Sequence, residues 1–199
     1  MAKLDILSIC LTATLGLLGS AGGLAAQPCG SDLTDEAAAL YPLPDKGKWG
    51  FVGADGEWRL APQWRQVRPF SEGLAAVESQ DGWGLITQDG TYVVEPRARD
   101  SDRVVISGTE YTLSPYKPMS EGCSAATPAG ETPHYVMASG DKWEPEALKD
   151  REVLDLGSFS EGLAWVRLRV GVETRVGWID TGGAMVIKPE FMDGGDFAE

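Results

Sequence analysis

The chain has little positive charge, and apart from one stretch near its start it has no long apolar run. Its 199 residues include 17 Lys and Arg against 30 Asp and Glu, a formal net charge of −13 at pH 7. Such a charge repels phosphate backbones, so we expect no binding to nucleic acid. Beyond the first thirty residues no stretch is apolar enough to cross a bilayer, and we expect no membrane span.

Histidine and nucleophile motifs are equally scarce. His134 is the only histidine, and the chain contains no zinc-type His/Cys spacing, no Gly-x-Ser-x-Gly and no phosphate-binding glycine loop. Glu72, Glu121, Glu161 and Glu199 recur singly at equivalent places, whereas acid–base catalysis needs two carboxyls that converge on one substrate. We therefore predict no enzyme, no cofactor and no metal ligands, and we interpret His134 as a surface or hairpin residue.

The single apolar run resembles a targeting segment. Lys3 precedes the run from 6 to 18, and small residues follow it, which is the layout of a secretory signal peptide. We predict that residues 1–26 are this signal peptide and that the mature protein is secreted or periplasmic. A lipid anchor is disfavoured, because Pro28 rather than a small residue precedes Cys29.

Of three cysteines, Cys10 leaves with the signal peptide, and Cys29 and Cys123 remain in a compartment that permits disulfides. A bridge between them would tie the N-terminal segment to the middle of the chain and stabilise it by about 2–4 kcal/mol. Two unpaired thiols or an intermolecular bridge are the alternatives.

Internal repetition is what the chain has in abundance. The stretch "FSEGLAAV" at 70–77 returns as "FSEGLAWV" at 159–166. A dipeptide of the Trp-Gly type is followed three times by a turn glycine and a proline at constant spacing: Trp49-Gly50 with Gly56 and Pro62, Trp83-Gly84 with Gly90 and Pro96, and Val176-Gly177 with Gly183 and Pro189. A fourth, degenerate copy begins at Met119. The spacing predicts about four repeats.

Each repeat has the pattern of a small β-meander. Apolar residues alternate, as in strands with one buried face, so Trp49 and Phe51 are expected on one face and Trp58 and Leu60 on one face of the next strand. Dipeptides such as Asp55-Gly56 supply the tight turns. The prolines are expected at the end of the third strand, and "FSEGLA" is expected to form a corner between repeats.

These observations predict an all-β fold of stacked β-meander or hairpin repeats. One meander is too small to be stable alone, so the repeats must share cores. An open array is favoured over a closed propeller, because the best repeats are separated by a gap and no closing half-repeat is present.

The sequence resembles bacterial proteins with WG (also called KWG) repeats. The resemblance rests on "GKWGFVGADGEWRLAPQW", "FSEGLAAV" and "GWIDTGGAMVIKPEF", and covers 46–98 and 158–199, with weaker coverage of 119–146. It implies repeats that act as binding or scaffold modules, with no enzymatic activity shared across the family. We divide the mature chain into an N-terminal segment, 27–45, and a WG-repeat domain, 46–199, with an irregular insertion at 97–118.

Two groups of residues are candidates for an interaction surface. Most of the seven tryptophans lie at core-type strand positions, but Trp64 and Trp143 lie beside the regular strands and are expected to be exposed. The insertion carries residue types that are enriched at interfaces: Arg97, Arg99, Arg103, Tyr111 and Tyr116. A solvated loop is the alternative interpretation. We predict a binding or scaffold module for a protein partner, or alternatively a cell-envelope glycan binder that uses exposed aromatic residues.

Overall fold

The computed structural model describes residue 29 and residues 39–97, 103–106, 109–112, 114–128 and 130–195, with backbone only at 103–106 and 109–112. The predicted signal peptide, Arg99 and residues 196–199 lie outside the described residues. Within the described part, no helix has the length and apolar character needed to cross a membrane.

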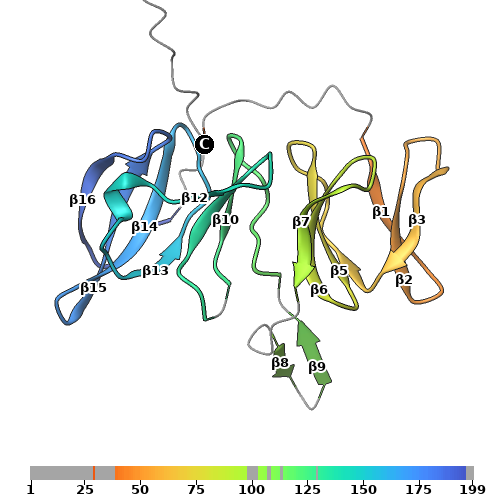
Figure 1. Cartoon of the computed structure of the whole chain (residues 1–199), viewed down its shortest axis with the longest axis horizontal. Helices are drawn as coiled ribbons and strands as arrows, with labels where there is room; N and C mark the ends of the chain where they lie inside the picture. Colours follow the sequence, from red (N-terminus) through yellow and green to blue (C-terminus); the bar gives the residue numbers. More distant parts are fainter. Residues whose placement is uncertain are drawn as a thin grey trace, which may run out of the picture.

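Four antiparallel sheets follow one another along the long axis of the molecule (Figure 1). The first contains β1 (Tyr41–Asp45), β2 (Lys48–Val52) and β3 (Trp58–Trp64), and the second β4 (Gln66–Val67), β5 (Leu74–Ser79), β6 (Gly82–Thr87) and β7 (Tyr92–Arg97). The third contains β10 (Cys123–Ala126), β11 (His134–Met137) and β12 (Lys142–Trp143), and the fourth β13 (Val153–Leu156), β14 (Leu163–Val170), β15 (Glu173–Asp180) and β16 (Met185–Phe191). A 3-10 helix, η2 (Glu146–Leu148), follows β12. None of these sheets closes into a barrel, so the predicted open array of β-meanders is confirmed.

The first sheet begins earlier than the sequence indicated. β1 pairs along its whole length with β2, from Tyr41↔Val52 to Asp45↔Lys48. It occupies the place that "GLAAV" fills in the second repeat. The first sheet therefore includes residues 41–45, which the sequence analysis assigned to the N-terminal segment.

Neighbouring sheets pack face to face and share their cores. One cluster of buried side chains lies between the first and second sheets, another between the second and third, and a third between the third and fourth. In β5, Ala75 and Val77 belong to the first core and Ala76 to the second. The expectation of one buried face per strand is corrected for such inner strands, because each inner sheet lies between two neighbours.

A bulge in the third strand explains the Trp-Gly dipeptide and its distant proline. Pro62 lies inside β3, not at its end, where the register against β2 shifts. A Cβ on Gly50 would lie 2.5 Å from the carbonyl oxygen of Leu60, and Gly84 and Gly177 face the same close approach. Glycine is required where the bulged backbone comes so near.

A second irregularity follows the hairpin turn directly and reverses the alternation. Phe51 pairs with Leu60, and the next residue, Val52, pairs with Trp58. Because adjacent strand residues face opposite sides, Trp58 and Leu60 face opposite sides too, and the predicted shared face was wrong. Leu60 packs against the first core, while Trp58 remains 39% exposed.

Trp64 is buried, with only 3% of its surface exposed, so the prediction of exposure was wrong. The bulge brings it opposite Trp49 and onto the face that carries Phe51. Its ring lies 5.9 Å from that of Phe51, and its indole N–H donates a hydrogen bond to the Tyr92 hydroxyl at 3.0 Å.

The Ser-Glu-Gly stretches form three tight turns that join one repeat to the next. In the first turn, Ser71 and Leu74 exchange both backbone hydrogen bonds, at 2.9 and 3.0 Å. The two central residues, Glu72 and Gly73, have φ angles of 46° and 79°. Positive φ at both central positions defines a type I′ turn. The turns at 120–123 and 160–163 have the same hydrogen bonds and the same signs of φ.

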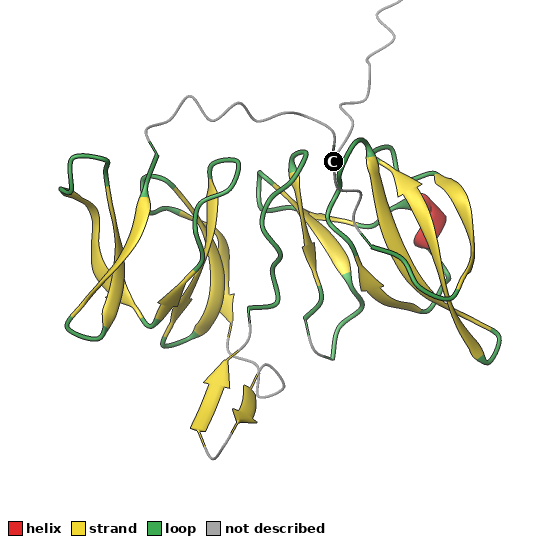
Figure 2. Cartoon of the chain, turned by 180° about the vertical axis from the view of Figure 1, so that it is seen from behind, coloured by secondary structure: helices red, strands yellow, loops and turns green. Residues whose placement is uncertain are grey.

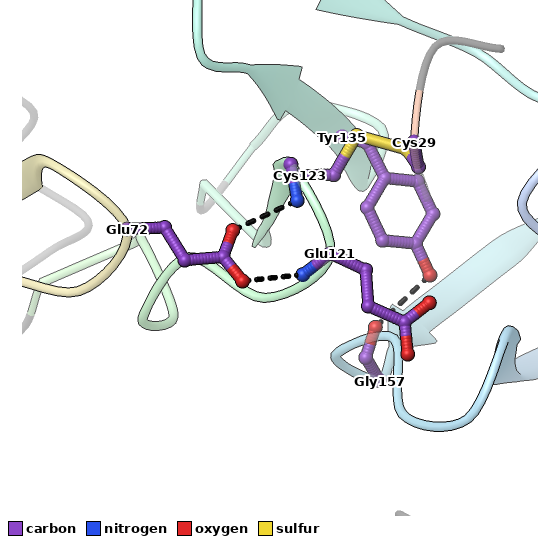
Figure 3. The surroundings of a disulfide bond; sticks show 7 residues. Cys29, Glu72, Glu121, Cys123, Tyr135 and Gly157 are labelled. Atoms are coloured by element: carbon purple, nitrogen blue, oxygen red, sulfur yellow. Dashed lines mark hydrogen bonds between the residues drawn. A yellow bond between two sulfur atoms is a disulfide. The ribbon is translucent and has the colours of Figure 1, made fainter. Parts of the chain in front are cut away.

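The side chains of these turns link neighbouring repeats. The Glu72 carboxylate accepts hydrogen bonds from the backbone N–H groups of Glu121 and Gly122, both at 2.8 Å (Figure 3). The Glu121 carboxylate in turn accepts the N–H of Gly162, at 3.0 and 3.1 Å from its two oxygens. The serine hydroxyls also bond to the next repeat. The Ser71 hydroxyl donates a hydrogen bond to the carbonyl of Met119, and the Ser120 hydroxyl donates one to the carbonyl of Phe159.

Cys29 and Cys123 form a disulfide with a Cα–Cα distance of 5.5 Å (Figure 3). Both residues are buried in the core between the third and fourth sheets. Next to them the Tyr135 hydroxyl donates to the carbonyl of Gly157 at 2.9 Å.

The insertion contains regular structure where the sequence predicted an irregular segment. β8 (Arg103–Ile106) and β9 (Thr109–Thr112) form a two-stranded antiparallel hairpin. It projects from one side of the array, between the second and third sheets, in both views (Figures 1 and 2).

Candidate functional site: a cleft between the second and third repeats

The third repeat differs from the others at the position that is glycine in each of them, namely Gly50, Gly84 and Gly177. The pairing Val136↔Lys142 repeats Val52↔Trp58 of the first sheet, so His134 stands where Gly50 stands in the first repeat. The strand opposite is also shortened, because β12 ends at Trp143 and the chain turns into η2. No bulged strand therefore crowds position 134, and a side chain fits.

A cavity of about 250 Å³ opens beside this side chain, between β7 of the second sheet and β11 and β12 of the third. Its lining residues are Val94, Glu95, Arg97, Tyr116, Glu131, His134, Val136, Gly140 and Lys142. Arg97 and Tyr116 belong to the insertion and lie before β8 and after β9 in the chain. The cavity therefore lies at the base of the β8–β9 hairpin.

His134 lies on β11 of a β-hairpin, one of the two predicted places, and it is buried rather than on the surface, with 8% of its surface exposed. Its Nδ1 donates a hydrogen bond to the Thr132 carbonyl at 2.9 Å, since a carbonyl can only accept. Burial lowers the pKa of the imidazole, and the Thr132 carbonyl opposes this effect. The neutral ring that results keeps Nε2 as a hydrogen-bond acceptor.

The cavity combines both signs of charge with an apolar floor. Arg97 and Lys142 are cationic, Glu95 is anionic, and Val94 and Val136 belong to or pack against the core between the two sheets. Lys142 is also paired with Glu144 at 2.7 Å. Such a lining can hold a polar side chain of a ligand by hydrogen bonds and partial neutralisation.

The described residues around the cavity include no serine, threonine or cysteine. Across the described part of the chain, no three His, Cys, Asp or Glu side chains are grouped so as to hold a metal ion.

The structure brings together two of the predicted interaction residues. Arg97 and Tyr116 line the same cavity, although Tyr116 is largely buried. Arg103 and Tyr111 lie on the two strands of the hairpin, where only the backbone is described. Arg99 lies outside the described residues.

The two predicted tryptophans do not belong to this site. Trp64 lies in the first core, as described above. Trp143 is partly buried against the last core, with its ring 5.6 Å from that of Tyr135 and 6.3 Å from that of Phe159.

An aromatic surface that the sequence analysis missed lies on the outer face of the first sheet. Tyr41, Val52 and Trp58 are neighbours in one cross-strand row, so their side chains share a face. Tyr41 is 52% exposed, and Leu43, two residues along on the same face, is exposed as well. In the sequence, only Trp58 pointed to this surface. The side of the sheet on which Trp58 lies could be assigned only once the register shift between β2 and β3 was known.

Comparison with known proteins supports the repeat assignment. The family described as WG containing repeat matches residues 49–82 and 177–199. The predicted resemblance to WG repeats is confirmed by these two matches. No curated protein and no solved structure matches the chain.

Proposed function

Because the chain carries WG repeats stacked into an open array, we propose that it is a non-catalytic module that binds a protein partner. The observation that carries this proposal is the β8–β9 hairpin, which projects from the array between the second and third sheets. Among the strands that the structure describes, β8 and β9 pair only with each other.

A hairpin of this kind offers backbone groups to a partner. Two-stranded hairpins are marginally stable alone in water, and no other strand in the described part of the chain pairs with either outer edge of this one, so its N–H and C=O groups can be offered to a partner. An extended peptide can add to such an edge as a further strand. The cavity at the base of the hairpin then receives a polar side chain of the same peptide.

The proposed binding takes place outside the cytoplasm, in the secreted or periplasmic space. The predicted signal peptide supports this location, and a disulfide between Cys29 and Cys123 is compatible with it, because disulfides persist in oxidising compartments.

The proposal is tested by replacing residues 98–113 with a short Gly-Ser linker in the mature chain, 27–199. Envelope and secreted proteins are captured with the parent and with the variant, and thermal melts accompany both. We expect a specific protein to be captured by the parent and lost by the variant, while the melt stays unchanged. Charge reversal of Arg97 and Lys142 should weaken the same capture. Equal capture by the parent and the variant would refute the proposal.

Glycan binding is the second candidate, and the outer face of the first sheet favours it. Exposed aromatic rings can stack on the apolar faces of sugars, and Tyr41 and Trp58 supply two on one face. This candidate predicts that Tyr41→Ala with Trp58→Ala abolishes retention on purified cell-wall glycan and that the linker variant retains it. Trp64→Ala is unsuitable for this purpose, because its ring belongs to the core.

A further inference from the structure

The type I′ turns between repeats act as receptors for carboxylates. The N–H groups of the two central residues are not used within the turn, and both have positive φ. In the second turn they belong to Glu121 and Gly122, and both donate to one carboxylate, that of Glu72. In the third turn Gly162 donates to the carboxylate of Glu121. The same turn thus binds a carboxylate twice in one molecule.

The first turn has the same hydrogen bonds and the same signs of φ, but it binds no carboxylate of the residues that the structure describes. Among the described residues, no acceptor lies within hydrogen-bond distance of the backbone N–H groups of Glu72 and Gly73. The sequence gives the reason. The pairing Leu43↔Gly50 of the first sheet repeats as Val77↔Gly84 in the second, an offset of 34 residues along the chain. By this count the residue that corresponds to Glu72 in the first repeat is Ala38, which lies outside the described residues.

A mostly apolar cavity of about 330 Å³ reaches Phe70, the residue that directly precedes this turn. It lies between the segment that follows position 38 and the segment that leads into the turn, and its lining includes Leu40, Tyr41, Pro42, Pro69, Phe70 and Gln88. A ligand that reaches the two N–H groups with a carboxylate can therefore place an apolar group beside them.

We propose that the backbone N–H groups of Glu72 and Gly73, with the adjoining cavity, bind the carboxylate of a partner peptide whose neighbouring group is apolar. The carboxylate belongs to an Asp or Glu side chain or to a chain terminus. Charge-assisted hydrogen bonds from two backbone N–H groups fix its orientation. This site is separate from the β8–β9 hairpin and does not depend on the function proposed for it.

The test follows the backbone amide signals of the mature protein by ¹⁵N–¹H NMR during titration with 3-phenylpropionate, which joins a carboxylate to an apolar ring. The matched control is 3-phenylpropanamide, which has the same ring and no charge. We expect saturable downfield shifts of the Glu72 and Gly73 amide protons with the acid and none with the amide. The amides of Glu121, Gly122 and Gly162 serve as internal references, because they already donate to carboxylates.

Two substitutions at position 38 make the test specific. Ala38→Glu restores the missing carboxylate within the chain, so the two amide protons should move downfield without ligand and no longer respond to it. Ala38→Gln introduces a side chain of similar size without charge. In this variant the Glu72 and Gly73 amide protons should stay upfield of their chemical shifts in Ala38→Glu. Peptides with an internal Glu and an amidated end, or with a free C-terminus and no acid, then separate the two sources of the carboxylate.

Three results would overturn the proposal. In the first, the Glu72 and Gly73 amide protons of the parent already lie downfield and respond to nothing, which would mean that the chain's own carboxylate occupies the turn. In the second, the shifts are linear in concentration and are reproduced by sodium chloride. In the third, Ala38→Glu leaves both signals unchanged. Binding by the variant that lacks residues 98–113 should equal that of the parent, which separates this site from the hairpin.

Discussion

At the scale of single residues, the recurring glutamate has a role that local preference opposes. A type I′ turn favours Asn or Gly at its first central position, because a longer side chain at positive φ is strained. Glu72, Glu121 and Glu161 nevertheless occupy it, at φ angles of 46°, 50° and 52°. The carboxylates of the first two explain why, since each binds the turn of the next repeat.

Glu72→Asn is therefore expected to destabilise the protein although Asn suits the turn better. Two charge-assisted hydrogen bonds are lost, at about 1.5–3 kcal/mol for a bond to a charged group, against a relief of roughly 1 kcal/mol in backbone strain. The net loss should be about 2–5 kcal/mol in urea unfolding. Glu161→Asn is the matched control. Its carboxylate is exposed and accepts no hydrogen bond from the described residues, so this change should be neutral or stabilising. Equal losses in both variants would contradict the linking role.

His134 predicts how stability depends on pH between 5 and 7. Its pKa is lowered in the folded state, chiefly by burial, with Lys142 acting in the same direction and Glu131 and Glu144 against it. A depressed pKa means that the unfolded state binds the proton more readily. Stability should therefore be complete above the unfolded value of about 6.5 and fall as the pH drops below it, by at most about 1.4 kcal/mol per pH unit.

The measurement is urea unfolding at pH 7.0, 6.0 and 5.0 for the parent and for His134→Gln. The Glu144 carboxyl titrates below this window, because a hydrogen bond from Lys142 lowers its pKa. The variant should lose the dependence on pH whatever its absolute stability. A slope that persists in the variant would show that another group is responsible.

At the scale of elements, the sequence predicted the strands and turns well and their faces less well. The turn glycines and the apolar alternation located the three-stranded meanders, because these signals are local. The orientation of Trp58 and Trp64 could not be predicted, since it depends on bulges that reverse the alternation within one strand. The cleft was missed for a related reason. His134 is informative only once the register shows that it replaces the glycine of the other repeats.

The bulge makes a specific prediction for the Trp-Gly glycine. In Gly84→Ala the added Cβ would lie 2.6 Å from the carbonyl oxygen of Val94, a contact with backbone that cannot simply move aside. We expect a loss of about 1–3 kcal/mol, as for other overpacked sites. Gly195→Ala is the control, because a Cβ there meets nothing within 4 Å. Thermal melts should separate the two variants, and similar melting temperatures would exclude a tight bulge.

At the scale of the whole molecule, each core is shared by two adjacent sheets only. The first core draws its residues from the first two sheets, and the last core from the third and fourth. In stacked repeats of this kind the free energy of unfolding is approximately the sum of the stabilities of the single repeats and of the interfaces between neighbours. A substitution that weakens one interface should therefore destabilise only the repeats on either side of it. The disulfide lies at one end of this series, in the last core.

Removing the disulfide should therefore loosen one half of the array. Cys29→Ser with Cys123→Ser opens a loop closed over 94 residues and is expected to cost about 2–4 kcal/mol. Hydrogen exchange followed strand by strand should show lost protection in β10, β11 and β14, while β5 and β6 keep theirs, because those strands contact only the other cores. Trp64→Ala should give the opposite pattern, with β5 and β6 affected and β14 protected. Uniform loss along the array in either variant would mean that the four sheets unfold as one cooperative unit.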